Sequence, residues 1–150
     1  MQHRLVDHSA IRVTQAFTIG LLLLAFILNA PILAAAVALA NLLGALAPEA
    51  GLFRRVYLGI LKPAGLVKSD VIEDNPEPHR FSQGLGALFV GLGLLAMAVG
   101  LPALGWGFVW LVIGLASLSL FLGFCAGCFV YYQLNKLGAP GFRHGPVRKA

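Results

Sequence analysis

Two long stretches without a charged side chain constrain the fold of this chain more than any other feature. Residues 16–47 and 81–134 contain no Lys, Arg, Asp or Glu, although the chain has eleven basic and six acidic residues. One membrane crossing needs about 17–25 apolar residues, so each stretch is long enough for two. The sequence therefore predicts an all-α, polytopic membrane protein.

Composition and charge point the same way. The mean hydropathy is +0.84, and 11% of residues are charged, against about 25% in soluble domains. The net charge of +5 could suit nucleic acid, but basic residues also gather on the cytoplasmic loops of membrane proteins. We expect contact with a lipid bilayer and no nucleic-acid partner. Because the first apolar run leads directly into a second, we interpret it as a retained helix rather than a signal peptide.

Four transmembrane helices are expected, arranged as two hairpins. Asn29 and Pro31 mark the first tip, and Gly100 and Pro102, followed by a stretch around Gly105, mark the second. Proline disfavours helix at the residue before it and therefore suits a tip. The predicted spans are residues 11–29, 31–47, 81–100 and 103–128, the last continuing to about 134. The chain 1–150 then forms a single membrane domain: hairpin 1 at about 11–48, an interfacial helix and loop at 50–80, hairpin 2 at about 81–134, and a disordered tail at 138–150.

The distribution of basic residues predicts the orientation. Every Lys and Arg lies in the amino-terminal tail, the central segment or the carboxy-terminal tail, and neither hairpin tip carries a charge. With four spans, these three segments share one side of the membrane. The positive-inside rule places that side, and both termini, in the cytoplasm.

The two hairpins resemble each other at a shift of 71 residues. His8 then aligns with His79, and Pro31 aligns with Pro102. This similarity predicts an internal repeat, with a pseudo-twofold axis along the membrane normal.

The central segment has two parts. Apolar residues recur at helical spacing from Leu52 to Leu61, while Arg54, Arg55 and Lys62 mostly occupy the other side. This pattern predicts a short amphipathic helix in the cytoplasmic interface. The polar residues 68–80, with four acids and two prolines, predict an extended, solvated loop.

The chain has only two cysteines, Cys125 and Cys128, which form a C-x-x-C motif near the cytoplasmic end of the expected fourth span. The cytoplasm is reducing, so a permanent disulfide is unexpected there. A dithiol that cycles, relays sulfur or binds a metal is the functional interpretation, and two small packed thiols are the structural one. The expected position near a helix carboxy terminus disfavours a thiolate.

Nearby cations could offset that disadvantage. Arg54, Arg55 and Arg80 are expected on the same side as the cysteines, where they would stabilise a thiolate or bind an anionic sulfur substrate. His79 and His8 are expected there too, and either could carry a proton during catalysis. Each arginine also has a simpler explanation as a charge near headgroups, and each histidine as an interfacial polar residue.

A metal site is a further interpretation. Cys125, Cys128, His8 and His79 supply the ligand set of a tetrahedral zinc site. Only the C-x-x-C half has a defined spacing, so we assign no metal from the sequence and leave the cofactor open.

Three segments together resemble a bacterial integral-membrane family catalogued as a domain of unknown function (number 4395). They are residues 7–12 (DHSAIR), the loop from Ile72 to Phe81, and residues 124–128 (FCAGC). The resemblance covers about residues 5–142 and implies a small protein of the bacterial inner membrane with no settled activity. It also implies an association with thioredoxin-like and rhodanese-type proteins, which favours thiol or sulfur chemistry at Cys125 and Cys128.

Three functions remain open at this point. The first is a membrane thiol/disulfide or sulfur-relay protein, in which the cysteines exchange with a cytoplasmic partner and electrons pass to an acceptor such as quinone. The second is a non-catalytic anchor whose acidic loop docks a soluble sulfur or redox enzyme. The third is a component of a small anion or sulfur-compound transporter, which at this size would require a homo-oligomer. The sequence leaves open whether the protein is an enzyme.

Overall fold

The computed structural model describes residues 4–47 and 49–141. Within these ranges the chain is mostly helical, with one two-stranded sheet. The elements are, in chain order, β1 (Arg4–Asp7), α1 (His8–Ile27), α2 (Pro31–Leu46), α3 (Leu52–Val56), the π-helix η1 (Tyr57–Leu61), β2 (Val71–Asp74), α4 (Pro76–Ala98), α5 (Pro102–Leu122) and α6 (Ala126–Lys136).

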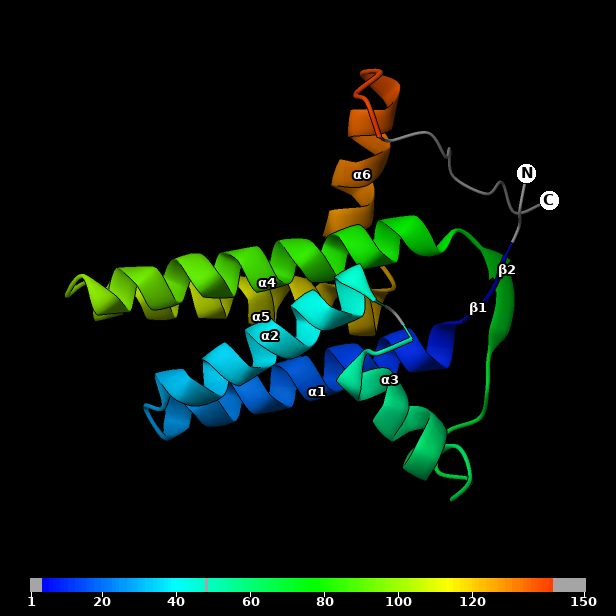
Figure 1. Cartoon of the computed structure of the whole chain (residues 1–150), viewed down its shortest axis with the longest axis horizontal. Helices are drawn as coiled ribbons and strands as arrows, with labels where there is room; N and C mark the ends of the chain where they lie inside the picture. Colours follow the sequence, from blue (N-terminus) through cyan, green and yellow to red (C-terminus); the bar gives the residue numbers. More distant parts are fainter. Residues whose placement is uncertain (1–3, 48, 142–150) are drawn as a thin grey trace.

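Two helical hairpins, α1–α2 and α4–α5, form the body of the molecule. Helix α1 packs against α2 and α5, and α4 also packs against α2 and α5, so the four helices close into a ring. Both hairpin tips lie at one end of the bundle, while the β-ribbon, α3 and α6 lie at the other (Figure 1). The polar elements of the described chain are therefore gathered at a single end.

The helices have the surface of a membrane protein. Leu22 and Val90 are fully buried in the bundle core, whereas Ile32 and Phe121 are 83% and 80% exposed on its outside. Three helices, α1, α4 and α5, are long and apolar enough to cross a membrane, and α2 is a shorter apolar helix of 16 residues. The expected helical architecture is confirmed, and the three long apolar helices suggest a membrane protein, while a fourth span through α2 stays a prediction.

The hairpin tips lie where the sequence places them, with one difference. Asn29 has a φ of 48° and Gly100 a φ of 90°, and α2 and α5 both begin at a proline. Gly105, however, lies inside α5 rather than in the connection. A Cβ at Gly93 would lie 2.7 Å from the Gly105 carbonyl oxygen, so these two glycines allow α4 and α5 to pack closely.

The central segment is more ordered than expected. The predicted short helix is present as α3 and η1, and its Phe53 and Tyr57 are buried. The prediction of an extended solvated loop at 68–80 is wrong in two respects: β2 pairs antiparallel with β1, and α4 begins at Pro76 rather than near residue 81. The side chain of Asn75 accepts the Glu77 backbone N–H and caps α4, while proline suits the first helical position. The predicted disordered tail lies mostly outside the described residues.

Candidate functional site

The cysteines lie at the beginning of a helix, and not near the end of one. Helix α5 ends at Leu122, and Gly123 adopts a left-handed conformation with a φ of 67°, which glycine tolerates best. Cys125 is the N-cap of α6, which projects from the bundle at a steep angle (Figure 1). The expected continuation of the fourth helix to residue 134 is therefore wrong. A helix amino terminus favours a thiolate, so the electrostatic argument against these cysteines is reversed.

Cys125 is held as a hydrogen-bond acceptor at this amino terminus. Its Sγ accepts the backbone N–H of Cys128 at 3.3 Å and lies 3.4 Å from the Ser82 hydroxyl of α4. The pKa of Cys125 is lowered to about 4. The largest cause is the hydrogen bond with the Cys128 side chain, and burial opposes it by raising the pKa. Hydrogen bonds with His79, Ser82 and the Cys128 backbone N–H lower the pKa further. Cys125 is therefore the thiol of the pair that holds negative charge at neutral pH.

Cys128 faces a chain of titratable side chains. Its Sγ lies 3.6 Å from Nδ1 of His79, and Nε2 of His79 lies 3.2 Å from Oδ2 of Asp74. The same carboxylate oxygen lies 3.0 Å from Nε2 of His8, and the two imidazole rings meet edge to face at 5.7 Å. The structure brings Cys125, Cys128 and His79 together, and Asp74 joins His79 to His8.

The side chains of this hydrogen-bonded series differ in protonation. The hydrogen bond with Cys125, together with burial, raises the pKa of Cys128 and keeps its thiol protonated. Burial alone would raise the pKa of Asp74, but the backbone N–H of Asn75 and the His79 imidazole outweigh it and lower the pKa. The site thus pairs one thiolate and one thiol with a carboxylate-bound histidine.

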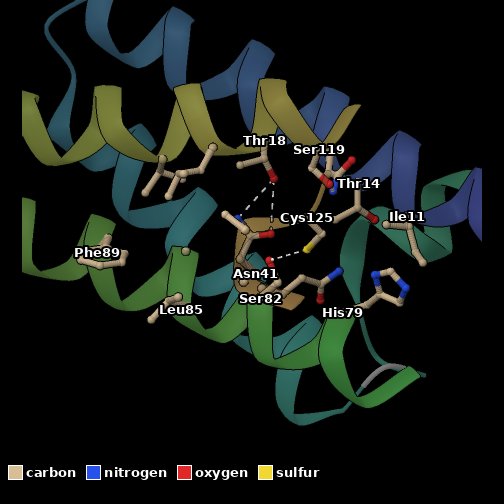
Figure 2. Close-up of a pocket in the computed structure, with 18 residues that line it drawn as sticks. Ile11, Thr14, Thr18, Asn41, His79, Ser82, Leu85, Phe89, Ser119 and Cys125 are labelled. Atoms are coloured by element: carbon tan, nitrogen blue, oxygen red, sulfur yellow. Dashed lines mark hydrogen bonds between the residues drawn. The ribbon is translucent and has the colours of Figure 1, made fainter. Parts of the chain in front are cut away.

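A cavity of about 80 Å³ with a mixed, mainly apolar lining lies on the bundle side of Cys125. Figure 2 shows Cys125 and Ser82 near its middle, with the hydroxyl side chains of Thr14, Thr18 and Ser119 across from them. Deeper in the cavity, Thr18 and Asn41 hydrogen-bond to each other between α1 and α2 at 3.2–3.3 Å. Cys125 lines this cavity, whereas Cys128 is 8% exposed and does not.

The three predicted arginines do not all reach the site. Arg54 and Arg80 line a groove of about 440 Å³ that also contains His79. The guanidinium of Arg80 donates to the carbonyls of Ala45 and Leu46 at 2.8 and 3.0 Å, at the end of α2. Arg55 donates to the backbone carbonyl of Glu49 and does not line the groove. Arg54 and Arg80 therefore lie in the groove beside His79, whereas Arg55 lies outside it.

Sequence reasoning missed two residues of the site, Asp74 and Ser82. The sequence signal for both was Asn75 followed by Pro76, a typical N-cap and first helical residue. A helix that begins there places His79 and Ser82, three residues apart, on one helical face. Gly127 allows α6 to approach α4 closely at this point, because a Cβ there would lie 2.8 Å from the Ser82 Cα. The Tyr131 hydroxyl also donates to the Glu77 carboxylate at 2.6 Å and joins α6 to α4.

These features define a helical bundle of membrane-protein character that carries two free cysteines at the amino terminus of a projecting helix. The chain belongs to the family described as a domain of unknown function (DUF4395), whose family model matches residues 6–136. No curated protein and no solved structure matches the chain.

Proposed function

We propose that the protein is a membrane thiol/disulfide or sulfur-relay protein that uses Cys125 and Cys128. The observation that carries the proposal is the unequal placement of the two thiols. Cys125 caps α6 and lines the cavity, while Cys128 is buried against His79. Unequal thiols of this kind suit an attacking and a resolving cysteine.

The exchange has two steps. The Cys125 thiolate attacks one sulfur of a substrate disulfide, forming a mixed disulfide and releasing the other substrate sulfur as a thiolate. Cys128 then gives its proton to His79 and attacks the Cys125 sulfur, releasing the second substrate thiolate. The protein dithiol has been oxidised to a disulfide and the substrate disulfide reduced by two electrons. A second dithiol, such as a thioredoxin-like protein, regenerates the pair by the reverse exchange. A persulfide partner of the rhodanese type would instead transfer its outer sulfur to Cys125.

Asp74 supports this proton transfer. Its carboxylate orients the His79 ring by binding Nε2, so Nδ1 faces the Cys128 thiol. His8 binds the same carboxylate oxygen at 3.0 Å and so helps to hold Asp74 in place beside His79. The groove beside His79 is lined by Arg54, Lys62 and Arg80 as well as by Asp7 and Glu49, and its basic residues could bind an anionic sulfur substrate.

We propose four spans with both termini in the cytoplasm of a bacterial inner membrane. The proposal is supported by the ring of four helices, the two uncharged tips at one end, and the basic residues outside the charge-free stretches. The site then lies at the cytoplasmic end, at headgroup depth, where a quinone is a second candidate electron acceptor.

The cavity within the bundle, which several hydroxyl and amide side chains line, favours a small transporter component as the second candidate function. The anchor hypothesis is less well supported, because two acidic residues of the expected docking loop hydrogen-bond to other side chains of the same molecule. Asp74 binds both histidines, and Glu77 accepts from Tyr131.

Thiol trapping in native membranes that have first been treated with a chelator, so that no bound metal masks the thiols, tests the proposal. A mass-tagged maleimide, applied after equilibration with a glutathione series, counts the reduced thiols. We expect one reversible two-electron step, lost in both Cys125→Ser and Cys128→Ser, with a mixed disulfide to the partner trapped only in Cys128→Ser. Two thiols that stay reduced across the whole series would refute the redox function, and flux into proteoliposomes would then support transport.

A further inference from the structure

Three potential ligand atoms converge beside the cavity. His79 Nδ1, Cys125 Sγ and Cys128 Sγ lie within 4.8 Å of one another. A tetrahedral zinc ion with ordinary bond lengths would place a sulfur and a nitrogen ligand about 3.6 Å apart, and two sulfur ligands about 3.8 Å apart. The observed separation of Cys128 Sγ from His79 Nδ1 is 3.6 Å. The three side chains thus stand close to a zinc-binding arrangement.

The groups around these atoms are those that a metal-binding imidazole requires. Nε2 of His79 binds the Asp74 carboxylate at 3.2 Å, which leaves Nδ1 directed at the thiols. A carboxylate in this position fixes the tautomer and orientation of a histidine ligand. Asp74 is itself fixed by the Asn75 backbone N–H at 2.8 Å and by His8 at 3.0 Å. The hydrogen bonds from Ser82 and the Cys128 N–H would likewise orient the Cys125 sulfur.

We propose that His79, Cys125 and Cys128 bind one zinc ion, with the fourth coordination position facing the cavity beside Cys125. Two thiolates and one imidazole are soft to intermediate ligands that suit zinc, and three protein ligands with an open position are the pattern of reactive zinc sites. His79 and Cys125 both line the cavity, so water or a small thiol can reach the ion from that side. His8 is not a ligand, because it binds Asp74 on the far side of His79.

The zinc site does not depend on the redox function. Zinc uses both thiolates, so the bound ion prevents disulfide formation, and a disulfide prevents zinc binding. A protein whose thiols never cycle could still bind the ion. The redox titration and the metal titration therefore fail independently of each other.

Cobalt substitution of the full-length protein tests the site. The protein is purified in detergent under reducing conditions, treated with a chelator, and titrated with Co²⁺. We expect one thiolate-to-cobalt charge-transfer band with tetrahedral d–d bands, saturating at one ion per chain, and its displacement by one equivalent of Zn²⁺. A competing chromophoric chelator then gives the zinc affinity.

Variants identify the ligands. Cys125→Ser, Cys128→Ser and His79→Gln should abolish the charge-transfer band or change its intensity by at least half, while His79→Cys, which restores a ligand, should retain binding. Asp74→Asn should weaken zinc binding by about 10–100-fold through loss of the oriented imidazole. Ser117→Ala is the matched control, because this hydroxyl donates to the Ile113 carbonyl of its own helix.

Two results would overturn the proposal. One is the absence of a charge-transfer band in wild-type protein whose two thiols are shown to be reduced. The other is a charge-transfer band that persists unchanged in His79→Gln but disappears in His8→Gln, which would make His8, and not His79, the nitrogen ligand of the thiolate-bound ion. Retention of the wild-type helical circular dichroism in each variant separates ligand loss from unfolding.

Discussion

Gly127→Ala is the sharpest test of how the site is assembled, because it adds one carbon between α6 and α4. The new Cβ would lie 2.5 Å from the Ser82 Oγ and 2.8 Å from the Ser82 Cα. The Oγ can rotate away, but the Ser82 Cα, at 2.8 Å, and Cβ, at 2.6 Å, cannot, so the helices must separate by about 0.6–0.8 Å to restore 3.4 Å contacts to both atoms. Overpacking of this kind costs about 1–3 kcal/mol.

The separation should also lengthen both sulfur contacts between the two helices. Cys125 Sγ to Ser82 Oγ is 3.4 Å, and Cys128 Sγ to His79 Nδ1 is 3.6 Å. A further 0.6 Å in either contact would remove most of its hydrogen-bond energy. A hydrogen bond to a charged group is worth about 1.5–3 kcal/mol, and 1.4 kcal/mol corresponds to about one pKa unit. The pKa of Cys125 should therefore rise by roughly 1–2 units.

Alkylation of Cys125 in chelator-treated membranes, followed by mass spectrometry as a function of pH, measures this change. Wild-type protein, with a Cys125 pKa of about 4, should react at a constant rate from about pH 5.5 upward. The Gly127→Ala profile should still be rising in that range. Gly114→Ala, whose Cβ would meet nothing within 4 Å, is the matched control and should keep the wild-type profile. Identical profiles and melting temperatures for the two variants would refute the close α4–α6 contact.

Three further variants test other parts of the fold by thermal unfolding in detergent. The Asp7 carboxylate accepts four hydrogen bonds, which lower its pKa although burial alone would raise it. Asp7→Ala should therefore reduce the free energy of unfolding by about 2 kcal/mol at pH 7. Because this pKa is lowered, the extra stability of wild-type protein over Asp7→Ala should be complete above pH 3.8 and should disappear as the pH falls through the pKa of Asp7 in the folded protein. A stability difference that is unchanged at pH 2 would contradict this. Asn41→Leu should cost about 1 kcal/mol, and a double-mutant cycle with Thr18→Val should give a coupling of about 0.6 kcal/mol; zero coupling would argue against their hydrogen bond. Arg80→Gln should lose about 1–2 kcal/mol by uncapping α2 without changing Cys125 alkylation; a slowed alkylation at wild-type stability would instead make Arg80 part of the thiol site.

The body of the fold was predictable because lipid simplifies the sequence signal. Charge-free length, glycine or asparagine at a tip and proline at the next helix start identify both hairpins, and Asn29, Pro31, Gly100 and Pro102 lie at those tips. These signals are local and require no knowledge of packing. They do not establish that α2, at 16 residues, crosses a membrane.

The end of the bundle that carries the site was less predictable, because hydropathy does not register a change of direction. The apolar run passes through Gly123 without interruption, so the sequence favoured one long helix, with Gly123 and Gly127 as a single packing motif. In the structure Gly123 ends α5 and Gly127 packs α6 on α4. Two glycines four residues apart therefore have different roles, which only the tertiary contacts reveal.

Asp74 shows the same limit for the chemical groups. In the sequence it is one of four acids in a polar segment, and its neighbours favour a solvated loop. Pairing of β2 with β1 brings it beside His8, and the early start of α4 brings it beside His79. A contact spanning 66 residues has no local signature, although the two histidines themselves were identifiable from the repeat.

The position of Cys125 connects the two proposals for the site. Its sulfur faces a cavity of about 80 Å³ inside the bundle, so a reacting partner must present a narrow group, and a zinc ion satisfies that size limit without any rearrangement of the helices. Thiol exchange and zinc binding both require Cys125 and Cys128 as thiolates at the moment of reaction. A disulfide removes the thiolates that zinc binds, and bound zinc holds the thiolates that would form a disulfide. The metal content of the protein therefore determines which chemistry an experiment can observe. A redox titration on zinc-loaded protein would report unreactive thiols even if the free dithiol cycles, so both titrations must begin from protein of known zinc content.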